Sequence, residues 1–170
     1  MNIEIYSHGE MPEAERKQLD VWLGLAFADD PNDLVWSKED WYVLVKLDGL
    51  AVSHVGIVER TGTVNGQPVK LGGIGGVATL PEYRRQGYAR FALETASTFM
   101  RGGLGVEFGL LICDHKMVPY YRRLGWHVVE GPLQFAQPKG QVTFTEPVMI
   151  LPCNKHDWPP GVIDLCGLPW

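Results

Sequence analysis

The stretch Gly72–Met100, GGIGGVATLPEYRRQGYARFALETASTFM, decides the fold that we expect for this chain. Its first part is apolar and stops at Pro81, and because a proline cannot donate to a strand ladder, this pattern predicts a strand that ends there. From Tyr88 to Phe99 the apolar residues recur at helical spacing, which predicts a helix. Amides in a first helical turn lack intrahelical partners, so the basic loop Arg84–Ala89 suits an anionic phosphate.

The order of strand, proline, Arg-Arg-Gln-Gly-x-Ala and helix resembles the acetyl-CoA loop of the GCN5-related N-acetyltransferases, the GNAT family, whose pattern is Arg/Gln-x-x-Gly-x-Gly/Ala. Arg84, Gly87 and Ala89 fill its three positions. Without that order, a solvated basic loop before an amphipathic helix would be the first interpretation. The resemblance implies acetyl-CoA as the cofactor, with loop amides on its pyrophosphate and strand backbone paired with its pantetheine arm. The residues that it assigns to acetyl-CoA are Val77, Ala78, Thr79, Arg84, Arg85, Gln86, Gly87, Tyr88 and Ala89.

Length and composition limit the class of protein. A chain of 170 residues predicts a single domain over 1–170, with enough apolar residues for a real core. Hydrophobic residues make up 45% and charged residues 21%, which argues against a disordered chain. The net charge of −5 argues against a general nucleic-acid binder and favours a cationic small-molecule partner.

Compartment is indicated by the cysteines and the N-terminus. Cys113, Cys153 and Cys166 have no metal-ligand spacing and are odd in number, so we expect free thiols in a reducing cytosol and no metal. The first residues lack a basic-then-apolar signal pattern, and no apolar run approaches the length of a membrane span. These features predict a cytoplasmic protein without a membrane partner.

Alternating strand and helix patterns predict an α/β (α+β) sandwich with antiparallel strands. The expected strands are 2–6, 42–47, 50–60, 69–79, 106–113 and 126–129, followed by a terminal hairpin drawn from Phe135, 142–144 and 148–151. The expected helices are 12–28, 36–40, 88–101 and 117–123, with Gly102 and Gly103 as the stop of the third. The family resemblance implies the GNAT fold, a central mixed and mostly antiparallel twisted sheet flanked by helices. In that fold a β-bulge and splayed strands form the acetyl-CoA site, and four glycines within 69–79 suit such a bulge.

The segment Tyr120–Trp126 is a second candidate for chemistry. Read alone, it is a core helix with buried tyrosines and a glycine cap. Beside the acetyl-CoA loop it resembles the family's second signature, Tyr-x-x-x-Gly-Phe/Trp, with Tyr121 in the tyrosine position. The resemblance implies a catalytic role for Tyr121, which would donate a proton to the leaving thiolate, because a bare thiolate is costly in an apolar slot.

A narrower resemblance, to the aminoglycoside 2'-N-acetyltransferases, covers most of the chain. It is carried by 26–30, 80–89, 111–126 and the tail from Leu151 to Trp170. In that group the aspartate matching Asp30 faces the drug, and the C-terminal carboxylate, here that of Trp170, contacts it. Polycationic amino sugars need several carboxylates, which makes this physically sensible. A homodimer is common in the family, so the resemblance also implies a possible homodimer.

One departure concerns the base that deprotonates the amine. The group carries a glutamate on the fourth strand, and the matching residue here is Gly75. Proton removal then falls to water, to the Trp170 carboxylate, or to another acid such as Asp114 or Asp164. Losing one negative charge suits a less cationic drug than a typical aminoglycoside, and kasugamycin fits. The expected substrate-binding residues are Asp30, Asp33, Asp114, Asp164 and Trp170, and the expected catalytic residues are Tyr121 and Trp170.

Three functions remain open from the sequence. The first is acetylation of an aminoglycoside, which would confer resistance because it removes a cation that grips RNA phosphates. The second is the same fold acting on another amine, such as a polyamine, an amino acid or a protein N-terminus. The third is a coenzyme A-binding protein without turnover, which the missing glutamate favours.

Overall fold

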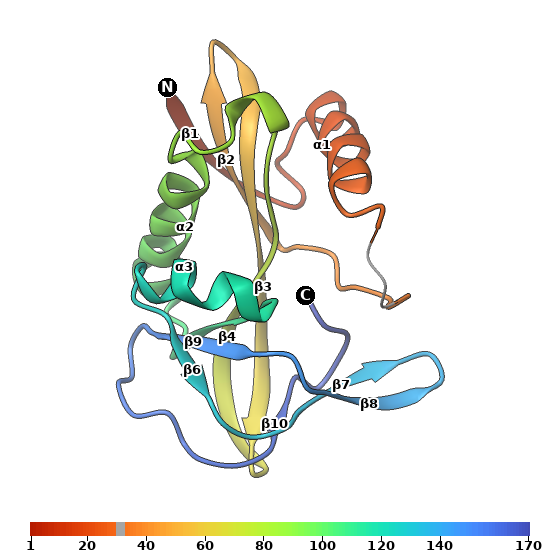
Figure 1. Ribbon diagram of the computed structural model, residues 1–170, viewed down its shortest axis with the longest axis vertical. Coiled ribbons are helices and arrows are strands. Elements are labelled where there is room, and N and C mark those ends of the chain that lie inside the picture. The colour runs from red at the N-terminus through yellow and green to blue at the C-terminus, as the bar shows by residue number, and fades with distance from the viewer. Residues whose placement is uncertain (30–32) are drawn as a thin grey trace.

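One sheet runs through the computed structural model, which describes residues 1–29 and 33–170 (Figure 1). Its strands are β1 (Asn2–Ser7), β2 (Trp41–Leu47), β3 (Leu50–Val64), β4 (Gln67–Thr79), β5 (Phe108–Ile112), β6 (His127–Val129), β7 (Leu133–Gln137), β8 (Gly140–Phe144), β9 (Val148–Pro152) and β10 (Ile163–Asp164). The α-helices are α1 (Glu13–Ala26), α2 (Tyr88–Phe99) and α3 (Val118–Arg122); shorter turns of helix are η1 (Pro81–Tyr83), η2 (Met100–Leu104) and η3 (His115–Met117).

Most neighbouring strands in this sheet are antiparallel. They follow the order β6-β9-β5-β4-β3-β10-β7-β8, and β2 joins β3 and carries β1 on its other side. The parallel pairs are β4 with β5 and β10 with β7. The predicted mixed and mostly antiparallel sheet is therefore confirmed.

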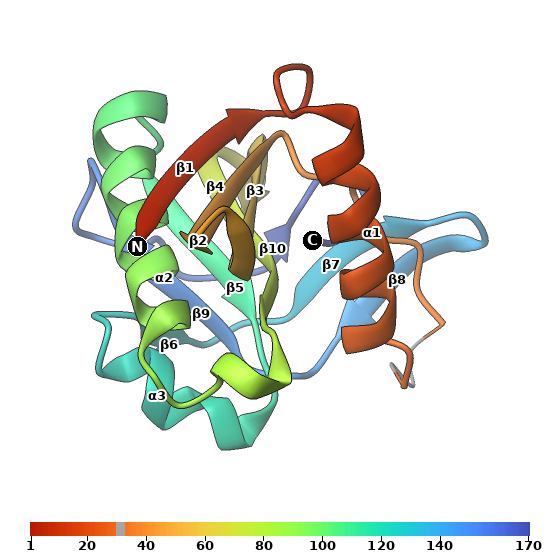
Figure 2. The same ribbon diagram turned by 90° about the horizontal axis from the view of Figure 1, so that it is seen from above.

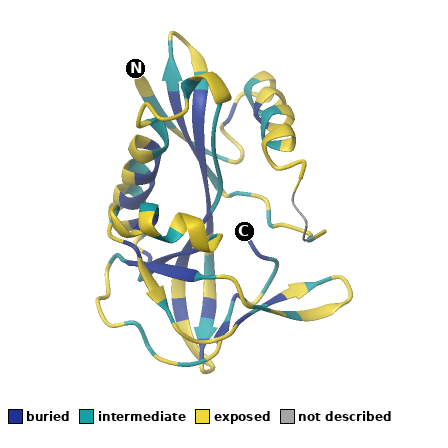
Figure 3. Cartoon of the chain, in the orientation of Figure 1, coloured by how far each residue is buried: buried dark blue, intermediate teal, exposed yellow. Residues whose placement is uncertain are grey.

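Helices α1 and α2 cover opposite faces of β2 and β3 (Figure 2). Helix α2 turns Ala92 and Leu93 inward, where they pack in one buried cluster with Val43 and Val55. A fully buried leucine such as Leu93 contributes about 1.5–3 kcal/mol relative to an exposed one, so the apolar spacing stabilises α2 in place. Figure 3 shows the same division, with buried residues along the strands and exposed residues on the outer faces of the helices.

The hairpin of β3 and β4 is the longest element of the fold. Its turn is Asn65-Gly66, with φ values of 47° and 75°, the left-handed conformations that a two-residue hairpin turn requires. We expected the first strand to end at Arg60, but pairing continues to Val64. The extra length is stabilised from the other side, because Ile163 of β10 pairs with Val64.

A bulge and a splay interrupt this hairpin on the side of β5. His54 is opposite Ala78 and Gly56 is opposite Gly75, so β4 has one more residue than β3 over this interval. Gly76, in the extra stretch, has φ 57°. Beyond it β4 loses its other neighbour, because its pairing with β5 covers only Leu71–Gly73. The predicted β-bulge and splayed strands are both confirmed.

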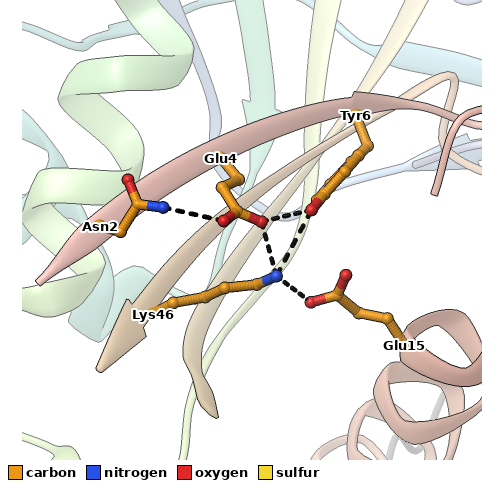
Figure 4. Close-up of polar contacts among 5 residues, drawn as sticks. All are labelled: Asn2, Glu4, Tyr6, Glu15 and Lys46. Atoms are coloured by element: carbon orange, nitrogen blue, oxygen red, sulfur yellow. Dashed lines mark hydrogen bonds and ion pairs between the residues drawn. The ribbon is translucent and has the colours of Figure 1, made fainter. Parts of the chain in front are cut away.

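An ion cluster fastens α1 to the edge of the sheet (Figure 4). Lys46 of β2 forms ion pairs with Glu4 of β1, at 2.6 Å, and with Glu15 of α1. Tyr6 donates a hydrogen bond to the same Glu4 carboxylate, and Asn2 donates another at 2.8 Å. Burial opposes the charge on Lys46, but the hydrogen bonds to Glu15 and Glu4 outweigh it and raise the pKa of Lys46. This cluster is therefore fully paired within the protein.

The predicted helix over 36–40 is wrong. This segment is extended, because its polar groups are bound to other parts of the chain rather than to each other. The amide of Ser37 donates to the carbonyl of Pro169 at 2.7 Å, and the amide of Asp40 donates to that of Ile57 at 2.9 Å. Tertiary hydrogen bonds here override the local pattern.

Two further expectations need correction. The terminal hairpin consists of β7 and β8, whereas 148–151 belongs to β9, which pairs with β5 and β6. Helix α2 continues through the turn η2 past Gly102 and Gly103, and the left-handed residue that ends it is Gly105, with φ 64°. Each error concerns a partner that is distant in the sequence or a choice between neighbouring glycines.

Within the residues described, no helix is both long and apolar enough to cross a membrane.

Candidate active site

The start of α2 leaves a row of free backbone donors. Within the described part of the chain, the amides of 85–90 donate to no protein acceptor, and the first loop bond is from Phe91 to the carbonyl of Gly87 at 3.1 Å. Gly87 has φ 88° and Arg85 has φ 62°, so the loop turns its amides together at the helix start. Concentrated N–H groups at the positive end of a helix dipole suit a phosphate.

The edge of β4 beyond the bulge is the second part of the site. Leu80 donates its amide to the carbonyl of Val52 at 2.9 Å, so this strand bonds β3 through Leu80 and, by alternation, Ala78. The backbone groups of Val77 and Thr79 therefore point the other way, into the gap that β5 has left. An extended ligand can pair with them like an added strand.

Side chains of the loop support its shape. Arg84 donates from Nε to the carbonyl of Thr79 at 3.1 Å, and Gln86 donates to the carbonyl of Glu82 at 3.2 Å. Among the polar contacts found, the Arg85 side chain makes none within the described residues, and it is exposed beside the free amides. Arg84 and Gln86 thus shape the loop, whereas the Arg85 side chain leaves its charge exposed beside the free amides.

Tyr121 lies on α3 with only 7% of its surface exposed, packed edge-on against Trp126. Burial raises the pKa of its hydroxyl, with smaller contributions from Cys113 at the end of β5 and from Tyr120. Its hydroxyl makes no hydrogen bond to any described residue of the chain. The group is therefore a protonated donor beside the strand that splays away from β4.

The end of the sequence reaches the bulge. The ring of Trp170 lies on Gly73, where any Cβ would overlap it, and its Nε1 donates to the carbonyl of Leu110 at 3.0 Å. Arg60 lies over this ring at 5.3 Å and donates to the carbonyl of Leu168 at 2.6 Å. A Cβ on Gly75 would be 2.8 Å from the main-chain carboxyl carbon of Trp170. Gly75 is thus small because the tail occupies the space above it.

The aspartates that we expected at the acceptor site are in different places. Asp30 is outside the described residues, and Asp33 is exposed with φ 44°. Asp114 caps η3 by accepting a hydrogen bond from the backbone amide of Lys116 at 3.0 Å, and it forms an ion pair with the Lys116 side chain. Asp164 accepts from Gln141 and from the amide of Cys166, and it pairs with Thr63, roughly 23 Å along β3 from Gly56. Asp164 is therefore far from the bulge, and Asp114 is engaged by Lys116.

Two residues that the sequence did not single out are at the bulge. Glu39 reaches it from the extended segment before β2, and His54 points there from β3. The ring of His54 donates from Nδ1 to the carbonyl of Gly76 at 2.7 Å. The sequence feature that could have pointed to them is the run of glycines in β4. Glycines leave space over a sheet, and side chains from other segments must fill it.

A bulged strand, an open sheet edge and a helix start with free amides together define a site for an extended ligand that carries phosphate. The sequence pattern of the family described as "Acetyltransferase (GNAT) domain" matches residues 13–129. This chain belongs to the GNAT acetyltransferase family, whose members use acetyl-CoA as the acyl donor.

Similar proteins agree with this family. An aminoglycoside 2'-N-acetyltransferase of Mycolicibacterium fortuitum is 26% identical over 117 residues, which are 68% of this chain and 59% of that protein. This chain therefore spans less than two thirds of that relative's length. Eis1 from Mycobacterium abscessus has a TM-score of 0.58 at 19% identity, covering 75% of this chain and 31% of Eis1. An acyl-CoA N-acyltransferase from Pseudomonas aeruginosa has a TM-score of 0.61 at 16% identity, covering 89% and 99%. Both structures share the fold.

Proposed function

We propose that this chain is an acetyl-CoA-dependent N-acetyltransferase whose acceptor is a primary amine of an aminoglycoside, the 2'-amine. The observation that carries the proposal is the row of amides at 85–90, which are free of acceptors within the described residues, beside the open edge of β4. Such amides are a ready phosphate site, and the strand edge gives an extended arm its hydrogen bonds.

The residues at hand fit acetyl-CoA, which supplies an acetyl group activated as a thioester. The loop amides and Arg85 would hold its diphosphate, and Val77 and Thr79 would hold the arm that leads to the sulfur. The acetyl group then lies in the splay between β4 and β5, where strand amides stabilise the carbonyl oxygen as it gains charge.

Tyr121 is the proposed proton donor to the sulfur. It lies beside the end of β5 and stays protonated at neutral pH, because burial raises the pKa of its hydroxyl. Proton donation matters here because an unprotonated thiolate is unfavourable in an apolar slot. General acid groups of this kind typically contribute about 10²–10⁴-fold to a rate.

The acceptor binds, in this proposal, on the α1 side of the bulge, where the tail ends. In a chain that ends at Trp170, its main-chain carboxyl group is a carboxylate next to Gly75. A carboxylate there attracts an ammonium group and orients it toward the splay. Kasugamycin is the proposed drug, because the acids Asp114 and Asp164 are engaged elsewhere and leave fewer negative charges for a strongly cationic one.

Thiol release with a panel of amines tests the proposal. The panel contains kasugamycin, gentamicin, spermidine and a short peptide with a free N-terminus, each with acetyl-CoA and purified protein. We expect release with kasugamycin and a lower kcat/KM with gentamicin. Similar values for the two drugs would contradict the choice of kasugamycin.

Other outcomes separate the remaining functions. Release with spermidine or the peptide alone would identify a different acceptor on the same fold. Binding of coenzyme A without release for any amine would identify a binding protein instead of an enzyme. Mass spectrometry of acetylated drug then locates the modified amine, and acetylation away from the 2'-position would overturn that part.

A further inference from the structure

We propose that Glu39 is the proton acceptor for the attacking amine, acting from the extended segment before β2. This assignment rests on the proposed function, because it takes the α1 side of the bulge as the acceptor site. Strand β4 carries no acidic side chain, so an acid at the bulge has to come from another element.

Glu39 lies directly on the bulge. Its Cγ fills the space over Gly56, where any Cβ would overlap it, and its Oε1 is 3.1 Å from the Cβ that a side chain at Gly76 would have. Gly76 is the residue whose φ of 57° forms the bulge. The carboxyl group therefore occupies the point where β4 turns away from its neighbours.

The tail and Glu39 share one face of the sheet. Gly56 and Gly75 are opposite each other across β3 and β4, and residues opposite each other have Cβ positions about 4.5–5.5 Å apart on one face. Glu39 covers the first glycine, and the main-chain end of Trp170 covers the second. An amine held by this end of the tail is thus within reach of Glu39.

Glu39 also has no cationic side chain paired with it in the described part of the chain. Among the described residues it has no ion pair, whereas the acids Glu4, Glu15 and Glu107 each pair with a lysine. Leaving a partly buried carboxylate unpaired is unfavourable, and a cationic ligand would relieve this. The missing cation is therefore supplied by the substrate, an ammonium group.

The groups around Glu39 favour proton uptake. Burial raises the pKa of Glu39, and the negative charges of Asp20 on α1 and of Asp40 act in the same direction, while its own backbone amide and His8 oppose it. Burial lowers the pKa of His54 to about 4, so this ring is neutral and adds no positive charge. Burial also raises the pKa of Tyr42 to about 12, with the Glu39 charge contributing. An acid with a raised pKa is the better base near neutral pH.

Neutral His54 completes the surroundings. In that state Nδ1 donates to the carbonyl of Gly76, which leaves Nε2 as an acceptor. This atom is buried and has no hydrogen-bond partner among the described residues. A buried acceptor without a partner, on a ring that lies over Gly76 together with Glu39, suits a bound water.

In the proposed step the attacking nitrogen loses two protons, one before and one after it bonds to the acetyl carbon. The bound ammonium gives one proton to Glu39 and becomes a neutral amine, which forms the new C–N bond to the acetyl carbon. The C–S bond breaks, and Tyr121 gives its proton to the sulfur. The second proton of the nitrogen passes to the Tyr121 oxygen, and Glu39 releases its proton to solvent.

Three variants of the full-length chain test this, with whichever amine the wild type acetylates. Glu39→Gln should lower kcat by about 10²-fold or more and remove the acidic limb of the pH profile of kcat/KM, with the KM for acetyl-CoA unchanged. Glu39→Asp, a shorter acid, should restore part of the rate. Glu15→Gln, the matched control at a paired acid, should leave the pH profile as it is.

A kcat within twofold of wild type in Glu39→Gln, with the acidic limb intact, would overturn the assignment alone and leave the proposed function standing. If the wild type released no thiol with any amine, the proposed function would fail first. Coenzyme A affinity measured by calorimetry shows whether each variant is folded. Should Glu39→Gln not bind it, Glu39→Asp decides, because an unshifted acidic limb there would equally contradict a proton acceptor at this position.

Discussion

Acids at two places on the α1 side of the sheet differ in whether a cation pairs with them. Glu4 and Glu15 form the first group, and Glu39 alone is the second. Where β1 pairs with β2, Glu4 and Glu15 enclose Lys46, and hydrogen bonds from Lys46 and Tyr6 lower the pKa of Glu4 (Figure 4). At the bulge, Glu39 has no such partner among the described residues, and burial raises its pKa. The first group holds α1 to the sheet, whereas the second is left for a ligand.

The contrast teaches how to separate structural from functional acids in one fold. A carboxylate that forms an ion pair with a lysine stabilises the fold, and its removal lowers the free energy of unfolding. A carboxylate that is held over glycines without a partner opposes stability and is retained for another reason. Five experiments test this distinction, from the largest expected effect to the smallest.

Gly75→Glu should be the most damaging change to the bulge. A side chain there would enter the space of the tail, since its Cβ alone would be 2.8 Å from the carboxyl carbon of Trp170. We expect kcat/KM for the acceptor to fall by about 10³-fold, because a misplacement of about 1 Å alone can cost 10²-fold. Steady-state kinetics with the acceptor varied measures it, and Gly102→Ala, where a Cβ would meet nothing within 4 Å, serves as a distant control. A more active variant would contradict the described place of the tail.

Tyr121→Phe tests the proposed proton donor to the sulfur, the counterpart of the proton acceptor Glu39. The variant keeps the packing against Trp126 and removes only the hydroxyl, so we expect kcat to fall by about 10²-fold with little change in acetyl-CoA affinity. Stopped-assay kinetics and calorimetry provide the two numbers. An unchanged kcat would exclude Tyr121 as the proton donor.

Lys46→Met breaks the paired group. Two acids then remain at a partly buried place without their cation, so the free energy of unfolding should fall by about 3 kcal/mol. Urea denaturation followed by fluorescence measures this. Acetyl-transfer kinetics should change little, and a specific loss of kcat in a folded variant would mean that the two groups are not separate.

Extending the chain beyond Trp170 by a short neutral tag tests the tail. In a chain that ends at Trp170, the tag converts the terminal carboxylate into an amide, so the KM for the acceptor should rise about 5–10-fold, as for the loss of one charge-assisted contact. The KM for acetyl-CoA should stay constant. If the acceptor KM is also unchanged, the main-chain end of Trp170 takes no part in binding.

The smallest effect compares Glu4→Gln with Glu39→Gln in stability against pH. The folded pKa of Glu4 is lowered, so its contribution is present above about pH 4.3 and disappears as the pH falls through the folded value. The folded pKa of Glu39 is raised, so its ionisation is unfavourable above that raised value, and the penalty fades as the pH falls towards the unfolded value. At pH 7 we expect about 1 kcal/mol of loss in Glu4→Gln and no loss, or a gain, in Glu39→Gln. A loss in both would contradict the distinction.

The sequence predicted those parts of the fold that are determined by a few neighbouring residues. The loop Arg84–Ala89, the helix that follows it and the Asn65-Gly66 turn are each encoded within a few neighbouring residues, and all three are where we expected them. The glycines of β4 predicted the bulge because a strand with so few side chains rarely stays regular.

The features that the sequence did not predict depend on contacts between distant parts of the chain. Glu39 belongs to a segment with a helical pattern, and its role at the bulge depends on Ser37 being bound to a tail more than a hundred residues later. The pairing of β9 with β5 and β6, instead of with β8, agrees with the burial of four of its five residues. The assignment of acetyl-CoA contacts, of Tyr121 and of the acceptor residues stays a prediction.

The long β3–β4 hairpin has a consequence for how the site is assembled as the chain folds. Its strands are joined by a two-residue turn, so their contacts can form within microseconds of each other, on the order of 1–10 μs. The parallel pairing of β4 with β5 covers three residue pairs, and it cannot form until the helix between them has folded. The gap between β4 and β5 therefore forms late in folding. Pulse-labelled amides of the hairpin should gain protection before those of β5, and a nascent chain would display its bulge before any ligand could lie beside it.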